Sequence, residues 1–497
     1  MRQKLSEGEN GTIGLTHTRF INTICTACTM NENLAHNALK RAQSDYAEVR
    51  MEEFRGLQVV IKNGNLDIFQ LKSSYGLSVR VLAEGGLGFA TTNVLTKVSI
   101  DQVVKKAEKL ARTSAAKNKH PIGLSEEDIY TDAYAVPQKK NIEDVDRVQE
   151  LLSINSRLES EGGLVFQIYD YEDEQRVKYF VNSEGAEIRS EIPRLSVLAV
   201  LTVMEGGKSE QCQLQYGGIG GWETFEGFNL YEKLPREIQV VYRALKEGKR
   251  APTEPVDVVM GPEVVGIAAH ESCGHPFEAD RILGREAAQA GESFVSPDMR
   301  GDVLGTELVT IAEDPTIEGS YGFYLYDEEG VKARKRLLIK EGRINEFLTN
   351  KETSYVLGEH SNGAARAIGY DREPIVRMAN TYFSAGDSSK GEMIEETKKG
   401  ILMESFTEWN IDDTRFNQRY IGREAYLIEN GEVTSPVVRP VLEITTKGFY
   451  SSVEAVGRDI TLFAGTCGKG DPSQGAPTSM GGPYVKLKNI RLGGAHG

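Results

Sequence analysis

The sequence has little cysteine, no long apolar run and no cluster of positive charge. Five cysteines among 497 residues are too few for a disulfide framework, so we expect a reducing, cytoplasmic compartment. The longest nearly apolar run, residues 195–204, is about half of the ~20 residues that a membrane-crossing helix needs. Residues 1–30 also lack the apolar segment of a secretory signal. We therefore expect no membrane insertion.

The charge balance excludes a further class of partner. Lysine and arginine number 58 and aspartate and glutamate number 73, which gives a net charge of −15. Nucleic acids and anionic membranes both require basic patches, so we expect neither as a partner. Apolar residues make up 39% of the chain and charged residues 26%, a composition typical of globular proteins.

The pattern of the chain predicts an α+β protein of two domains. Residues 1–30 are polar and without a sustained period, and we expect a disordered tail. Residues 31–250 mix helical and strand periods, which predicts an N-terminal α+β domain with antiparallel hairpins. We place the boundary at Lys249-Arg250-Ala251-Pro252, so that residues 251–497 form a β-rich C-terminal domain.

Short segments with a period of two predict several strands in the N-terminal domain. They are residues 46–49, 57–61, 66–71, 77–81, 164–171, 177–182 and 195–204. Asn63-Gly64 predicts a tight hairpin turn. Helical periods predict helices at about 142–160 and 229–247.

The C-terminal domain opens with a predicted strand at Val256–Met260. Pro262 suits the first turn of a helix, which we expect to run from about 262 to 274. Many short strands bounded by glycine follow, with turn signals such as Glu341-Gly342 and Asn430-Gly431.

The sharpest chemical feature is the hexapeptide His270-Glu271-Ser272-Cys273-Gly274-His275. Neutral imidazoles are good Zn²⁺ ligands, and a neighbouring glutamate can accept the proton of a zinc-bound water. The alternative is a pair of structural histidines bonded to backbone or carboxylate groups. Two of only seven histidines flank one carboxylate here, which favours the metal site.

The spacing of the two histidines requires an irregular helix. Residues five apart diverge by about 140° on a regular α-helix. Pro276 removes a backbone donor and clashes with the carbonyl four residues back. We therefore predict a π-type turn or an unwound end that brings His275 beside His270.

A catalytic zinc site needs a third protein ligand, and the residues leave several candidates open: Cys273, Glu278, Asp280 and Cys467. A buried thiol suits Cys273 better than ligation, and Glu278 and Asp280 are more suited to orienting the imidazoles. Cys467 lies in a glycine-rich segment, residues 465–470, that we expect to be a flexible loop, with Lys469 favouring its thiolate form.

The single pair Cys25 and Cys28 has no second CxxC pair, and we assign it no metal or redox function.

Six stretches, taken together and in order, resemble the TldD/PmbA family of zinc metallopeptidases, and within it the TldD-type catalytic subunit. They are Tyr46–Arg50, His270–Asp280, Asp327–Gly330, Pro374–Tyr382, Glu424–Gly431 and Gly465–Lys469. The resemblance covers residue 31 to the C-terminus.

The resemblance implies that His270, His275 and Cys467 bind one Zn²⁺ and that Glu271 is the general base. It also implies a peptidase that cleaves unfolded or modified peptides. The expected partners are an extended peptide substrate and a second subunit, either a copy of this chain or a PmbA/TldE-like subunit. The alternatives are a non-catalytic regulatory subunit of such a complex and a zinc amidohydrolase that acts on small amides.

Overall fold

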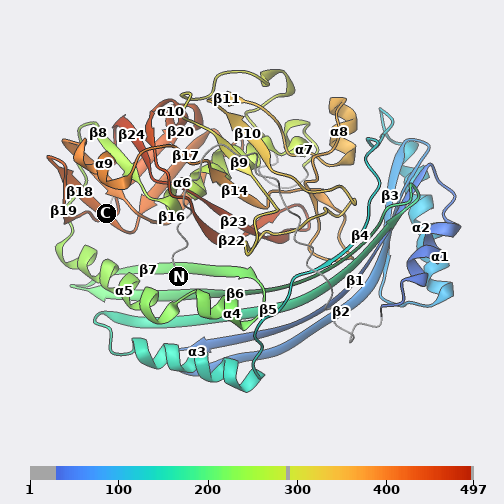
Figure 1. Ribbon diagram of the computed structural model, residues 1–497, viewed down its shortest axis with the longest axis horizontal. Helices are drawn as coiled ribbons and strands as arrows, with labels where there is room; N and C mark the ends of the chain where they lie inside the picture. The colour runs from blue at the N-terminus through green and yellow to red at the C-terminus, as the bar shows by residue number, and fades with distance from the viewer. Residues whose placement is uncertain (1–29, 287–291, 494–497) are drawn as a thin grey trace, which may run out of the picture.

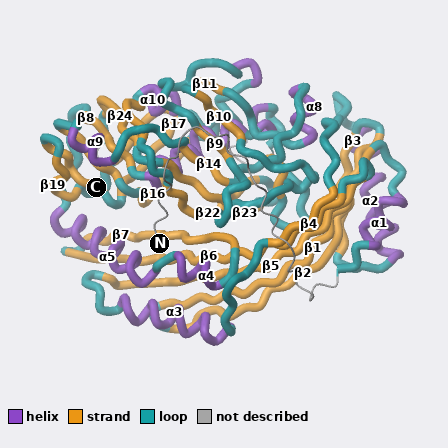
Figure 2. The backbone as a smooth tube through the Cα atoms, in the orientation of Figure 1, coloured by secondary structure: helices purple, strands orange, loops and turns teal. Residues whose placement is uncertain are grey.

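The computed structural model describes residues 30–286 and 292–493. Cys25, Cys28 and the expected disordered tail before Met30 lie outside the described residues. The fold is α+β, as predicted, and strands predominate in it (Figure 2). Among the described residues we find no helix with the length and apolar character required to cross a membrane.

The first half of the chain builds one large, curved sheet, which Figure 1 shows in blue to green. Its strand order is β3-β2-β1-β5-β6-β4, and β7 also pairs with β6. The strands are β1 (Tyr46–Lys62), β2 (Asn65–Ala83), β3 (Gly86–Thr92), β4 (Thr131–Ala135), β5 (Leu164–Asn182), β6 (Glu187–Glu205) and β7 (Lys208–Ile219). The helices are α1 (Asn33–Arg41), α2 (Lys97–Ala115), α3 (Asp144–Leu158), α4 (Trp222–Gly227) and α5 (Leu230–Glu247).

Four of these strands, β1, β2, β5 and β6, are longer than the sequence predicts. The separate strands expected at 46–49 and 57–61 are one strand, β1, and those at 66–71 and 77–81 are likewise parts of β2. The expectation of separate strands was wrong because the polar residues between the segments do not leave the sheet. They continue the strands on both faces of the sheet: Glu52 is buried, whereas Arg55 and Ser73 are exposed. The hairpin at Asn63-Gly64 is confirmed.

The two faces of this sheet carry different side chains. Val49 and Val59 of β1, on one face, belong to two apolar clusters, formed with α1 and α2 at one end and with α3, α4 and α5 at the other. Glu48, Arg50 and Glu52 point to the opposite face and are also buried, at 1%, 5% and 3% exposure. That second face is covered by the C-terminal half of the chain, as Figure 1 shows.

The second half of the chain forms several smaller sheets around one large apolar cluster. Their orders are β11-β10-β9-β14-β23-β22, β19-β18-β15-β8-β24-β21, β16-β17-β20 and β12-β13. The β-rich character and the strand at Val256–Met260 (β8) are as predicted.

The strands of this half are β8 (Val256–Met260), β9 (Ile311–Glu313), β10 (Arg336–Lys340), β11 (Arg343–Ile344), β12 (Ala365–Arg366), β13 (Ile375–Val376), β14 (Asn380–Phe383), β15 (Lys399–Met403), β16 (Phe406–Ile411), β17 (Asn417–Gly422), β18 (Ala425–Glu429), β19 (Glu432–Pro436), β20 (Val441–Thr445), β21 (Val453–Val456), β22 (Thr461–Lys469), β23 (Gln474–Gly482) and β24 (Val485–Ile490). The helices are α6 (Pro262–Ala269), η1 (His270–Gly274), η2 (His275–Phe277), α7 (Ala279–Ile282), η3 (Pro297–Met299), α8 (Lys351–Leu357), α9 (Lys390–Glu395) and α10 (Thr446–Ser451).

Helix α6 packs directly on strand β23, and a glycine permits that approach. A Cβ atom at Gly266 would lie 2.5 Å from the backbone nitrogen of Gly481, closer than van der Waals contact allows. The close packing fixes the end of α6 beside the β22–β23 hairpin. The next turn of the chain is therefore held against that hairpin.

Candidate metal centre

The helix that begins at Pro262 changes geometry at the first histidine. After Ala269 the chain makes a π-helical turn over His270–Gly274, and the amide of His275 donates to the carbonyl of His270. The predicted irregularity is thus confirmed. A π turn places residues five apart on one face, and the two imidazole rings lie 5.0 Å apart between centroids.

Packing and Pro276 both favour this wide turn. Pro276 lies in the short 3₁₀ turn that follows, where its missing N–H costs no α-helical bond. A Cβ atom at Gly274 would lie 1.8 Å from the sulfur of Met378, so only glycine fits there. Met378 therefore lies directly against the π turn.

Cys467 reaches the two histidines from strand β22. Its Sγ lies 3.3 Å from Nε2 of His275, and one ligand atom from each of His270, His275 and Cys467 lies within 4.8 Å of the other two. All three residues are buried. The glycine-rich segment around Cys467 is part of a paired strand, so the expectation of a flexible loop was wrong.

The environment favours a thiolate at Cys467. Burial opposes ionisation, but the charges of His275, Arg377 and His270 hold the pKa of the Cys467 thiol well below its usual value. Arg377 also donates a hydrogen bond to the carbonyl of Cys467. Lys469, which we expected to favour the thiolate, instead directs its ammonium group to Asp280 and the carbonyl of Val376.

Glu278 and Asp280 have different neighbours. Glu278 Oε2 lies 3.0 Å from Nδ1 of His275 and also accepts from Nε of Arg281 at 2.9 Å. Burial raises the pKa of Glu278, but Lys469 and His275 lower it more, and the pKa lies well below its usual value. Asp280 accepts from Lys469 at 2.7 and 2.8 Å. Of these two carboxylates, Glu278 alone bonds an imidazole among the described residues, so its geometry suits the expected orienting role. Asp280 instead holds Lys469.

The carboxylate of Glu271 is held by two side chains that the sequence analysis missed. Trp409 Nε1 donates to one oxygen at 3.2 Å, and Arg415 Nη1 donates to the other at 2.5 Å. Trp409 lies in β16, and Arg415 lies in the turn that follows with a φ of 66°. Both are more than 130 residues from Glu271 along the chain, and no local pattern could have indicated them.

Cys273 takes no part in the three-residue group. It is fully buried in the apolar cluster around α6, and burial raises the pKa of its thiol well above the usual value. Cys273 therefore packs in this cluster as a small apolar side chain.

The donor set and its surroundings fit a divalent metal ion. Two imidazoles and one thiolate are ligands that Zn²⁺ takes in proteins, and three protein ligands with a further open position are typical of catalytic zinc. Nδ1 of His270 is buried and has no hydrogen-bond partner among the described residues. A buried polar atom without a partner is rare in native proteins, which adds to the fit of this group to a metal ion.

Comparison with known proteins places the chain in a family. Models of the PmbA/TldA metallopeptidases match residues 47–111 (domain 1), 132–248 (central domain) and 253–494 (C-terminal domain). The chain belongs to this PmbA/TldD family of metallopeptidases, as the sequence analysis predicts.

Two curated relatives illustrate the likeness. A metalloprotease of Methanocaldococcus jannaschii is 31% identical over 446 residues, which cover 89% of this chain and 96% of the relative. A zinc metalloprotease TldD homolog of Saccharolobus solfataricus is 26% identical and covers 92% and 99% of the two chains.

Solved structures show the same fold. TldE from Thermococcus kodakarensis has a TM-score of 0.71 at 18% identity and covers 93% of this chain and 99% of its own. A putative modulator of DNA gyrase from Thermotoga maritima has a TM-score of 0.73 at 15% identity, with coverages of 93% and 100%.

Proposed function

We propose that this protein is a zinc-dependent peptidase that hydrolyses peptide bonds of unfolded or modified peptides. His270, His275 and Cys467 hold one Zn²⁺ ion, and Glu271 is the general base. The observation that carries the proposal is the convergence of three buried metal-ligating groups within 4.8 Å, with a glutamate next to the first of them in the chain. The division of the chain into two domains near residue 250 is part of the same proposal.

The ligand charges suit hydrolysis. Two neutral imidazoles and one thiolate leave a divalent ion with a net charge of +1. A site of two histidines and one glutamate would have the same net charge. Zinc at such a site supplies Lewis-acid chemistry, which polarises a peptide carbonyl and makes water acidic enough to lose a proton near neutral pH.

Glu271 moves the protons of the reaction. A carboxylate has about four acceptor positions, and the bonds from Trp409 and Arg415 use two of them. The remaining positions let Glu271 accept the proton of the attacking water and pass it to the leaving amine. Glu278 meanwhile fixes the orientation of the His275 ring through Nδ1.

The substitution Glu271→Gln tests this proposal. We expect it to retain the zinc and to lower kcat on a fluorogenic peptide by about 10²- to 10⁴-fold, because it removes a general base. Glu443→Gln is the matched control, since that side chain is 61% exposed on β20, and its rate should equal the wild-type rate. Metal content is measured on the same samples with and without chelator.

Three results would contradict the proposal. Undiminished cleavage by Glu271→Gln would exclude the base. A zinc-loaded wild-type protein that cleaves no peptide but forms a stable complex with a paralogous subunit would favour the regulatory alternative. Cleavage restricted to small amides would favour the amidohydrolase.

We also propose that the protein works as a dimer, with a second copy or a PmbA/TldE-like subunit. Strand β3 pairs with β2 only over Leu77–Ala83, so the other end of β2 is an edge of the sheet. Leu66, Phe69 and Leu71 on this edge are 49%, 46% and 69% exposed. Unpaired edges with apolar side chains are surfaces that proteins normally cover. Light scattering and mass spectrometry of the native complex measure the stoichiometry and identify the partner.

A further inference from the structure

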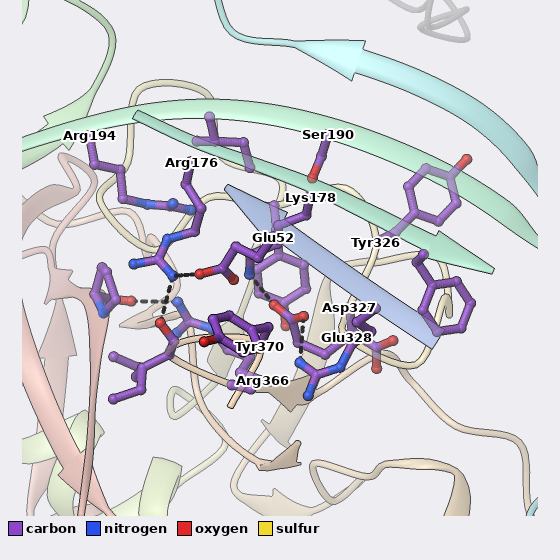
Figure 3. A pocket seen from close by; sticks show the side chains of 18 of the residues that line it. Glu52, Arg176, Lys178, Ser190, Arg194, Tyr326, Asp327, Glu328, Arg366 and Tyr370 are labelled. Atoms are coloured by element: carbon purple, nitrogen blue, oxygen red, sulfur yellow. Dashed lines mark hydrogen bonds and ion pairs between the residues drawn. The ribbon is translucent and has the colours of Figure 1, made fainter. Parts of the chain in front are cut away.

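A cavity of about 210 Å³ lies between the polar face of the large sheet and the C-terminal half of the chain. Side chains of β1, β5 and β6 form one wall, and loops of the C-terminal half form the other, as Figure 3 shows. Six tyrosines line it: Tyr134, Tyr179, Tyr321, Tyr324, Tyr326 and Tyr370. The cavity also reaches strands β22 and β23, the pair that carries Cys467.

Most of the charges in this cavity are paired with one another. The basic side chains that line it are Arg50, Arg176, Lys178, Arg194 and Arg366. Glu328 pairs with Arg50 and Lys178, and Glu52 and Glu174 pair with Arg176. Arg194 lies 3.6 Å from Glu174, which it shares with Arg176.

Arg366 is different, because no carboxylate of the described residues lies within 4.0 Å of its guanidinium group. Its two hydrogen bonds go to backbone carbonyls, from Nη1 to Met378 at 2.6 Å and from Nη2 to Pro477 at 2.8 Å. Its guanidinium also lies 5.4 Å from the centre of the Tyr324 ring. Arginine has five N–H donors, so three remain uncommitted.

The surroundings of Arg366 do not supply the missing negative charge. The residue is only 9% exposed. Burial lowers the pKa of its guanidinium to about 10, and Arg377 and Arg194 act in the same direction, while Tyr324 and Glu313 oppose them. Glu313 is itself paired with Arg336 and lies beyond ion-pair distance of Arg366. A buried cation without a negatively charged partner is unfavourable unless a bound ligand supplies the opposite charge.

We propose that this cavity binds a carboxylate group, that Arg366 is its anchor, and that the ligand is the carboxyl-terminal end of a short peptide. The peptide identity rests on the proposed peptidase function. Arginine matches a carboxylate with two parallel N–H donors, which makes it the preferred residue for this recognition. The tyrosine-lined walls suit the peptide part, since amphipathic rings contact both apolar and polar groups.

The size and place of the cavity agree with this ligand. Its volume lies below the ~300 Å³ at which pockets for drug-sized molecules begin, so it accommodates the end of a peptide more readily than a long segment. Thr466 and Pro477, which line the cavity, are cross-strand partners, and the next pair along the hairpin is Cys467 with Ala476. The carboxylate site therefore adjoins the strand pair of the candidate metal centre.

Calorimetric binding of two peptides tests the proposal. They share one sequence with an acetylated N-terminus, and one has a free C-terminal carboxylate while the other has a C-terminal amide. The protein is the zinc-loaded Glu271→Gln variant, so that cleavage does not interfere, and a chelator-treated sample is measured in parallel. We expect the free carboxylate to bind about 10- to 100-fold more tightly in both samples, as expected for hydrogen bonds to a charged group.

Variants of Arg366 assign the preference to this cavity. Arg366→Gln should bind both peptides equally and weakly, and Arg366→Lys should keep part of the preference because it keeps the charge. Arg157→Gln, an exposed arginine of α3 that pairs with Glu161, should behave as the parent protein. Circular dichroism checks the fold of each variant, and Arg366→Lys together with the peptide pair decides the case if Arg366→Gln does not fold.

Each other outcome overturns the proposal. Equal binding of the two peptides would mean that Arg366 has only a structural role, as a donor to the carbonyls of Met378 and Pro477. A preference that disappears on chelation would make the metal the carboxylate receptor. Equally tight binding of inorganic phosphate would show a general anion site. The test is independent of catalysis: if the zinc-loaded wild-type protein cleaves no peptide while the variant keeps the preference, the peptidase is refuted and the carboxylate site stands.

Discussion

Two groups of buried polar side chains in this protein differ in one respect: the members of one group form ion pairs with one another, and the members of the other do not. At the candidate metal centre, three donors from two places in the chain converge and Nδ1 of His270 has no partner among the described residues. Between the sheet and the C-terminal half, Arg80 lies between Glu48 at 2.9 Å and Glu329 at 2.5 Å, all at 3% exposure or less. The first group brings together potential metal ligands, whereas the second pairs one cation with two carboxylates and joins the two halves. Buried polarity alone therefore does not identify a functional site.

The largest effect that separates the two groups should come from Cys467→Ala. Loss of the thiolate ligand should reduce bound zinc to near zero and peptidase activity by at least about 10³-fold, because the metal supplies most of the transition-state stabilisation. Cys273→Ala is the matched control, since this buried thiol lies in the same turn outside the donor group, and it should keep zinc and activity. Elemental analysis and a peptide assay measure both. Full zinc occupancy in Cys467→Ala would show that Cys467 is not a zinc ligand.

A substitution in the balanced group should affect stability instead. Arg80→Met leaves Glu48 and Glu329 buried without their cation and should lower the free energy of unfolding by about 3–5 kcal/mol. Denaturant titration measures it. Arg55→Met, at a side chain 61% exposed, should change it by less than ~0.5 kcal/mol. Equal values for the two variants would remove the distinction between a buried network and a surface pair.

Acid should weaken the contact between the two halves through Glu328. Burial raises the pKa of this carboxyl, but Lys178 and Arg50 lower it more, to about 2. Because the folded pKa is below the ordinary value, the stabilisation is present above about pH 4.5 and is lost as the pH falls towards 2. The loss should amount to roughly 3 kcal/mol. The difference in unfolding free energy between wild type and Glu328→Gln should shrink over this range, and a constant difference would refute the assignment.

The smallest effect should follow from Glu278→Gln, which changes the partner of a candidate ligand and leaves the ligand in place. We expect the zinc affinity to fall by about 10- to 100-fold, measured by competition with a chelator of known affinity. Asp280→Asn provides the contrast, because Asp280 bonds Lys469 and not an imidazole, and its affinity should fall less. A larger loss for Asp280→Asn would reverse the roles of the two carboxylates.

Part of this architecture could be predicted from local sequence. Asn63-Gly64 indicates its hairpin because a tight turn needs particular backbone angles. Pro262 begins α6 and Pro276 accompanies the change to a π turn, since proline acts on its own neighbours along the chain. The strands β1 and β2 were harder to predict. Buried polar residues of β1 face a second layer of protein, whereas β2 is mostly exposed over residues 65–75, so neither strand keeps one alternation of buried and exposed residues along its length.

Local patterns in the chain are enough to infer the short-range chemistry: two histidines with a glutamate between them, on a helix that must become irregular. The folded arrangement was needed to see that Cys467 lies on a strand against those histidines, that Trp409 and Arg415 hold Glu271, and that Arg366 lies buried with no carboxylate of the described residues beside it. The physical reason is distance along the chain. Backbone periodicity and turn propensities act over a few residues, whereas these contacts join residues about 140 to 200 positions apart and depend on how the sheets pack.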